Sequence, residues 1–81
     1  MAAGEMDREV YGNHGGNSGV RYFAFGPSSI RVWFKGDDGY EYDDSRPGRA
    51  HVDAMKRLAA EGRGLATYIN RHIRGNYARK L

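Results

Sequence analysis

The chain has 81 residues, a net charge of +3 at pH 7 and no cysteine. This length accommodates a single small domain, and the lack of cysteine excludes both a disulfide framework and a thiolate metal site. No stretch approaches the ~18 consecutive apolar residues of a membrane span, and residues 1–12 lack the apolar segment of a signal peptide. We therefore expect a cytoplasmic protein with no membrane partner.

Charge is distributed unevenly along the chain. Residues 1–44 carry four basic and eight acidic side chains, a net of −4, whereas residues 45–81 carry nine basic and two acidic side chains, a net of +7. A basic half favours an anionic partner. The alternative is that these cations form a solvated helix face or pair with acidic residues of the same molecule.

Residues 1–18 show no hydrophobic periodicity and end in GNHGGNSG, a run of glycine, asparagine and serine with one histidine. This composition predicts a flexible N-terminal tail. We place the folded domain at residues 19–77 and a short basic C-terminal tail at residues 78–81.

Three strands are predicted between residues 19 and 44. The first covers residues 19–25 and ends at a turn that contains Pro27. The next two alternate strictly between apolar and polar residues, and a GDDG loop at residues 36–39 joins them as a β-hairpin. The alternating apolar residues are Ile30, Val32, Phe34, Tyr40 and Tyr42, and the residues between or beside them are Arg31, Trp33, Lys35, Glu41 and Asp43.

Two helices follow the predicted strands. Apolar residues at helical spacing predict one helix over residues 49–61, which Gly62 ends, and another over residues 65–74, which Gly75 ends. The fold class is therefore α+β: a three-stranded antiparallel β-meander with two C-terminal helices packed on one face.

Six residues at regular places in these elements point to a known family. They are a phenylalanine in the second strand, a Tyr-x-Tyr in the third, an Asn-x-x-Ile in the second helix and a tyrosine after it: Phe34, Tyr40, Tyr42, Asn70, Ile73 and Tyr77. In this order, over residues 20–77, they resemble the KTSC domain family. The resemblance departs from the family pattern at Asp37, where a turn glycine is expected.

KTSC domains occur as small bacterial single-domain proteins and at the C-terminus of some lysyl-tRNA synthetases. The resemblance implies the same fold, with the six residues in structural roles. The function of the family is unknown, and the synthetase association suggests RNA binding.

No residue pattern predicts catalysis. His14, His51 and His72 are isolated in sequence, so we expect neither a metal site nor a cofactor. The adjacent acids at 37–38 and 43–44 suit turns. A sheet under two helices in about 60 residues leaves little room for a pocket of ~300 Å³ or more, so we expect neither an enzyme nor a small-molecule substrate.

Nucleic-acid binding is the leading functional hypothesis. Trp33 between Arg31 and Lys35 resembles the stacking platforms of single-stranded RNA binders, and Tyr22 or Phe23 would widen that platform. A second basic surface would combine Tyr77 with the C-terminal cations Arg71, Arg74, Arg79 and Lys80.

Two alternatives remain open. Trp33 packs against its own chain in one of them, and a register that places Glu41 beside Arg31 would pair these charges and remove the platform. In the other, the protein is a protein–protein interaction or homo-oligomerisation module that uses a sheet edge or an exposed Trp33.

Overall fold

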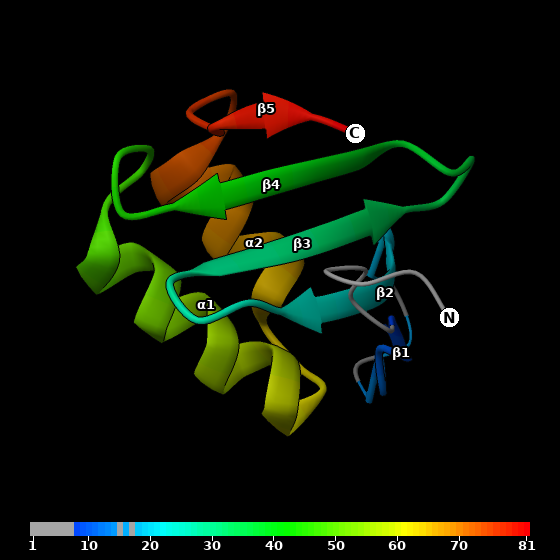
Figure 1. Ribbon diagram of the computed structural model, residues 1–81. Helices are drawn as coiled ribbons and strands as arrows, with labels where there is room; N and C mark the ends of the chain where they lie inside the picture. The colour runs from blue at the N-terminus through cyan, green and yellow to red at the C-terminus, as the bar shows by residue number, and fades with distance from the viewer. Residues whose placement is uncertain (1–7, 15, 17) are drawn as a thin grey trace.

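The computed structural model describes residues 8–14, 16 and 18–81. These residues form one antiparallel sheet of five strands in the order β1-β2-β3-β4-β5, and the helices cover one face of it (Figure 1). The elements are β1 (Glu9–Val10), β2 (Val20–Phe25), β3 (Ser29–Phe34), β4 (Gly39–Asp43), α1 (Arg49–Glu61), α2 (Leu65–Tyr68), η1 (Ile69–Ile73) and β5 (Arg79–Lys80).

The predicted α+β class, with an antiparallel meander and two helical segments, is confirmed, but the sheet has five strands rather than three. The additional strands lie at the two edges. Glu9 of β1 pairs with Phe23, and Arg79 of β5 pairs with Glu41. Two-residue strands are too short to show an alternating pattern, so periodicity does not predict them.

Residues 8–14 differ from the flexible tail that we predicted for residues 1–18. Tyr11 is buried, its N–H donates to the carbonyl of Arg21 at 2.9 Å, and its hydroxyl accepts the N–H of Leu65 at 3.2 Å. The N–H of His14 donates to the carbonyl of Gly62 at 2.8 Å. This segment therefore belongs to the fold, whereas residues 1–7, 15 and 17 of the predicted tail lie outside the described residues.

The core lies between the sheet and the helices. The register pairs Ile30 with Tyr42 and Val32 with Tyr40, which places all four side chains on the helix-facing side. Each fully buried aliphatic side chain contributes about 1.5–3 kcal/mol to folding. The helices complete this layer with Val52, Met55, Ala59, Leu65, Ile69 and Ile73.

The first helix has the predicted bounds. Gly62 ends it in the left-handed conformation (φ 74°), and its N–H donates to the carbonyls of Leu58 and Ala59. Glycine adopts this conformation without the steric cost that a Cβ imposes. No helix in the described part of the chain is long and apolar enough to cross a membrane.

The second helix covers the predicted region but changes its geometry midway. A single α-helical turn, α2, continues directly into the π-helical η1. The N–H of Arg74 donates to the carbonyl of Ile69 at 2.6 Å, five residues back. This wider turn ends the second helix away from the β3–β4 loop, near Arg46, whose Nε donates to Asn76 Oδ1 at 3.1 Å.

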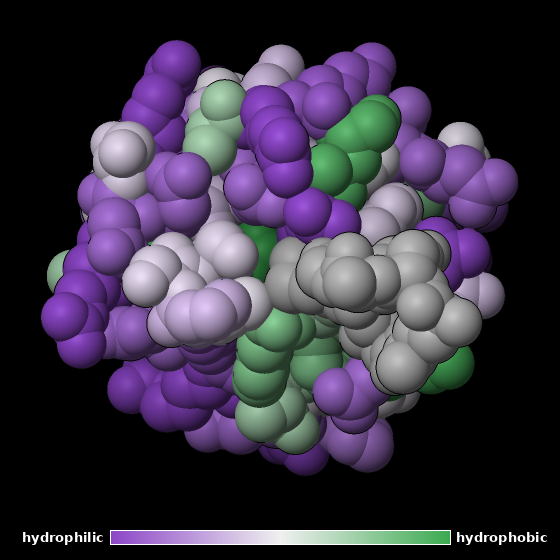
Figure 2. Space-filling model, in the orientation of Figure 1, coloured by the Kyte–Doolittle hydropathy of each residue, from purple (hydrophilic) through white to green (hydrophobic). Residues whose placement is uncertain are grey.

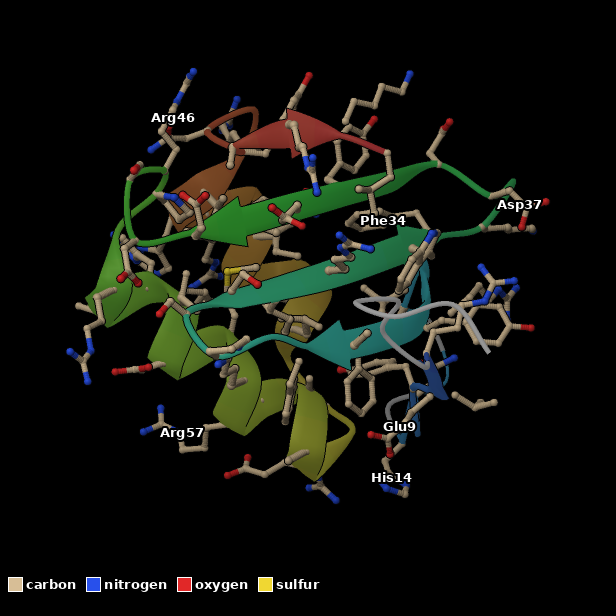
Figure 3. All side chains as sticks on the ribbon, in the orientation of Figure 1. Glu9, His14, Phe34, Asp37, Arg46 and Arg57 are labelled. Atoms are coloured by element: carbon tan, nitrogen blue, oxygen red, sulfur yellow. The ribbon has the colours of Figure 1, made fainter. Side chains whose placement is uncertain are left out.

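The β3–β4 loop holds the position where the KTSC pattern has glycine. Asp37 occupies the left-handed region there, with φ 69°, next to Gly36 at φ 90°. Aspartate tolerates this region better than most residues, so the loop keeps a sharp turn without the expected glycine. Figure 3 shows Phe34 and Asp37 toward this end of the sheet and Arg46 at the opposite end of β4.

Candidate functional site

The sheet face opposite the helices carries the predicted RNA-stacking platform. The register places Arg31 directly beside Glu41. Arg31 Nε donates to Glu41 Oε1 at 2.8 Å, and Arg79 Nη2 lies 3.3 Å from the same oxygen. One carboxylate thus engages two of the predicted phosphate-binding cations, which is the arrangement expected to remove the platform.

Trp33 packs against its own chain on this face. The register sets it beside Tyr22, and the guanidinium carbon of Arg8 lies 4.4 Å from the centre of the Tyr22 ring and 5.3 Å from that of Trp33. A Cβ added at Gly39 would come within 2.6 Å of the indole, so the ring lies close against this glycine. Phe23, the other residue considered for the platform, is buried in the core.

The seven predicted nucleic-acid-binding residues therefore do not form one surface. Arg31, Trp33 and Arg79 share the open sheet face, on which Figure 2 shows hydrophilic residues around several apolar ones wherever grey atoms do not cover it. Lys35 is exposed beyond the end of β3. The other three lie on or near the helix side: Arg71 and Arg74 in and after η1, and Lys80 with its Nζ 6.0 Å from the centre of the Tyr40 ring.

A pocket of about 550 Å³ opens between the strand ends and η1, which corrects the expectation that the fold has little room for one. Large aromatic side chains of β3 and β4 form one wall of the pocket, and η1 with the residues that follow it forms the other. We call this site the tyrosine pocket, and it is lined by Phe34, Asp38, Tyr40, Tyr42, Ile69, Asn70, Arg74, Gly75 and Tyr77.

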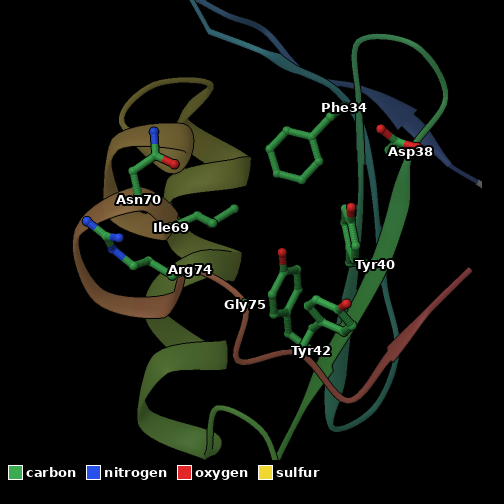
Figure 4. Close-up of a pocket in the computed structure, with 9 residues that line it drawn as sticks. Phe34, Asp38, Tyr40, Tyr42, Ile69, Asn70, Arg74 and Gly75 are labelled. Carbon is green, nitrogen blue, oxygen red and sulfur yellow. The ribbon is translucent and has the colours of Figure 1, made fainter.

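Aromatic rings form the strand side of the tyrosine pocket. Phe34 and Tyr40 meet edge to face with ring centres 5.9 Å apart, and Tyr40 and Tyr77 lie 4.7 Å apart. Figure 4 shows Phe34, Tyr40 and Tyr42 on this side, with Ile69 and Asn70 across from them on the helical segment. The rings thus provide an apolar wall with hydroxyl groups at its edge.

Five of the six residues that carry the KTSC resemblance line this pocket, and the sixth, Ile73, is buried in the core. The sequence therefore identified most of the aromatic wall but assigned it only a structural role. Asp38 and Ile69 were not identified as site residues from the sequence, because no local sequence pattern sets them apart from other loop and helix residues. A cluster of tyrosines near the end of a two-layer fold is the signal that points to a pocket.

The pocket carries both signs of charge at its rim. Asp38 lies at the β3–β4 loop, and Arg74 follows η1 on the other side, with its guanidinium turned away from the tyrosines on the side of Asn70 (Figure 4). Burial raises the pKa of the Tyr42 phenol above its usual value, and the neighbouring Tyr40 and Tyr77 raise it further. Tyr42 is therefore protonated near neutral pH.

Arg74 has a backbone conformation that normally requires glycine. Its φ is 51° and its ψ is −123°, and the N–H of Asn76 donates to the carbonyl of Ile73 at 3.0 Å to close the turn. These angles match the second residue of a type II′ turn, where glycine dominates. A non-glycine residue in such a region costs on the order of 1–3 kcal/mol.

Two histidines that are isolated in sequence meet between the helices. The rings of His51 and His72 stack with centres 6.5 Å apart, and His51 Nδ1 lies 2.7 Å from the Tyr68 hydroxyl. Within the described residues, no group of three or more potential ligands is placed to hold a metal ion. We interpret this cluster as packing between α1 and the second helix.

Comparison of the chain with protein-family models, with curated proteins and with solved structures finds no match in any of the three. The resemblance to the KTSC family stays a prediction. The functional argument therefore depends on the geometry of the tyrosine pocket.

Proposed function

We propose that the protein is a non-catalytic module that binds single-stranded RNA, with an unpaired base in the tyrosine pocket. The observation that supports this proposal is the aromatic wall of Phe34, Tyr40 and Tyr77 in a pocket that Arg74 also lines, with Lys80 Nζ 6.0 Å from the centre of the Tyr40 ring. Stacking of one base on an aromatic side chain contributes ~1–3 kcal/mol, and cations beside it attract the phosphates. RNA binding also agrees with the suggestion attached to the KTSC resemblance.

The chemistry of the pocket favours binding over catalysis. The raised pKa of the Tyr42 phenol keeps that group protonated, so it offers a hydrogen-bond donor rather than a base. Asp38 and Arg74 are exposed at the rim. General acid–base catalysis needs a pair of groups within hydrogen-bond reach of the reacting atoms, and nothing in the lining favours such a pair.

The alternative, a protein–protein interaction module, has weaker support. The edge strands β1 and β5 have two residues each and carry Glu9, Arg79 and Lys80, features that discourage pairing with another sheet. Trp33 is partly buried and lies beneath Arg8, so it does not stand out as an anchor for a partner.

The test is fluorescence anisotropy of the full chain with a labelled single-stranded RNA of about eight nucleotides. If Arg74 and Lys80 each neutralise one phosphate, raising the salt concentration from about 50 to about 200 mM weakens binding about sevenfold. Tyr77→Leu is expected to weaken binding at least about fivefold through lost stacking. The matched control is Tyr22→Leu, a partly buried tyrosine on the open sheet face.

Two results would overturn the proposal. One is an absence of binding at low salt, or binding that salt does not change. The other is equal loss of affinity in Tyr77→Leu and Tyr22→Leu, which would place the RNA elsewhere than the tyrosine pocket. For the interaction-module alternative, light scattering that finds a stable homo-oligomer would be the supporting result.

A further inference from the structure

Arg74 combines two departures from regular geometry at the rim of the tyrosine pocket. Its N–H donates the π-helical hydrogen bond to the carbonyl of Ile69 that ends η1, and its own φ of 51° lies where glycine is favoured. Single π-helical turns and strained non-glycine residues both occur frequently at functional sites. The next residue is Gly75, so a glycine stands one position after the strained one.

The side chain at this position gives a reason for the strain. A guanidinium binds a phosphate through two parallel hydrogen bonds, which no other side chain does as well. Arg74 is exposed, so its guanidinium is free to turn from the side of Asn70 toward the rings. Lys80, above the ring of Tyr40, adds a second positive charge on the same side of the sheet.

The side of the pocket across from Arg74 carries a negative charge, that of Asp38. The carboxylate of Asp38 repels a phosphate and accepts hydrogen bonds from amino groups. A ligand between Asp38 and Arg74 is therefore oriented, with its phosphate at Arg74, its planar ring against the aromatic wall and its amino group toward Asp38. A nucleotide whose base has an exocyclic amine meets all three conditions.

The volume of the pocket limits the number of nucleotides. Pockets for ligands of drug size measure ~300–1,000 Å³, and about 550 Å³ suits one nucleotide rather than several. Neighbouring nucleotides find no second platform on the open sheet face, since Glu41 engages Arg31 there and Arg8 lies over Trp33.

From these observations we propose that the tyrosine pocket is a one-nucleotide site that binds a nucleoside monophosphate unit, with Arg74 as its phosphate-binding residue. The inference deepens the proposed RNA-binding function and rests on it for the class of ligand. It predicts that the module recognises a single phosphorylated nucleotide, such as a strand end, rather than a run of bases.

The first test is calorimetric titration of the full chain with adenosine 5′-monophosphate, uridine 5′-monophosphate, adenosine, inorganic phosphate and a 5′-phosphorylated single-stranded RNA of about eight nucleotides. Adenosine is expected to bind at least about tenfold more weakly than its monophosphate, because it lacks the charge-assisted pair with Arg74. Uridine monophosphate, without an exocyclic amine, is expected to bind more weakly than adenosine monophosphate. The RNA is expected to bind no more than about threefold more tightly than the mononucleotide, since it gains no second stacking site.

The second test uses variants of residue 74 and separates binding from stability. Arg74→Gly is expected to weaken binding of adenosine monophosphate at least about tenfold and to raise Tm by about 4–8 °C, because glycine relieves the strained φ. Arg74→Ala removes the guanidinium but keeps the strain, so it should lose the same affinity without the gain in Tm. Arg71→Ala, an exposed arginine in η1 that does not line the pocket, is the control and should leave binding unchanged.

The outcomes distinguish this inference from the proposed function. RNA that binds in a salt-dependent manner while the mononucleotide does not would overturn the one-nucleotide site and leave RNA binding intact. Binding of the mononucleotide without the RNA would support the site and overturn the RNA proposal. If adenosine bound as tightly as adenosine monophosphate, or if Arg74→Gly kept full affinity for the monophosphate, Arg74 would not be the phosphate-binding residue. If inorganic phosphate bound as tightly as adenosine monophosphate, the aromatic wall of the pocket would not contribute to binding.

Discussion

Glu41 determines what the open face of the sheet can bind. Alternation in the sequence placed Arg31, Trp33 and Lys35 in the same strand and suggested a basic aromatic platform. The carboxylate of Glu41 is only 14 % exposed and accepts hydrogen bonds from Arg31 and Arg79. A cation held in this way has less charge to offer a phosphate, so this face is less suited to RNA than its composition implies.

We predict that Glu41→Gln lowers the free energy of unfolding by about 1–3 kcal/mol, because it leaves the partly buried Arg31 without a counter-charge. Urea denaturation at neutral pH measures the loss. Glu61→Gln, at the exposed end of α1, is the control and should change stability by less than about 0.5 kcal/mol. A loss of similar size in both variants would contradict the role given to the Arg31–Glu41 pair.

The segment at residues 8–14 acts as a structural element although only two of its residues form a strand. Its backbone adds an edge to the sheet, and its side chains reach the start of the second helix. The imidazole of His14 lies beside Gly62, where an added Cβ would come within 2.8 Å of it. The glycine that ends α1 therefore also makes room for this segment.

Tyr11 is the point at which this segment joins the core, and its hydroxyl is a testable part of that contact. Tyr11→Phe removes the acceptor for the N–H of Leu65 and leaves that buried donor without its partner. We expect the free energy of unfolding to fall by about 1–3 kcal/mol.

Urea denaturation, with Tyr22→Phe on the open sheet face as the control, measures this effect. The control is expected to change stability by less than about 0.5 kcal/mol. If Tyr11→Phe were as stable as the wild-type protein, the hydroxyl would not contribute to anchoring residues 8–14.

At the scale of the whole molecule, the buried phenol of Tyr42 links stability to pH. Its pKa is raised in the folded state, mainly by burial, whereas in the unfolded chain it titrates near 10. Above pH ~10 the unfolded state therefore releases a proton that the folded state retains, and the free energy of unfolding falls by up to ~1.4 kcal/mol per pH unit. Below this range the contribution is fully present.

Tyr42→Phe removes this proton, so the variant should lose stability less steeply than the wild-type protein as the pH rises. Urea denaturation midpoints measured between about pH 8 and about pH 11 test the prediction. All other titrating groups are common to both proteins, so the difference between the two curves belongs to Tyr42. Parallel curves would contradict the prediction.

The central part of the fold was predictable because its residues obey strong local patterns. Alternation fixed the helix-facing side of β3 and β4, and Gly62 marked the end of α1. The edge strands were not predictable, since two residues have no period and gain their stability from the neighbouring strand. The π-helical turn was missed for a similar reason: its apolar spacing is close to that of an α-helix, and packing against the sheet decides between them.

The sequence by itself determined the α+β class, the order of the three central strands, the bounds of α1 and the aromatic residues at Phe34, Tyr40, Tyr42 and Tyr77. Only the tertiary structure decided that Glu41 forms ion pairs with Arg31 and Arg79 on the open face. It also decided that the aromatic residues line a pocket with Arg74 at its rim. Periodicity reports which side of a strand or helix a residue faces. Register, layer coverage and the conformation of a single turn depend on contacts between residues far apart in the chain, and these contacts place the candidate site.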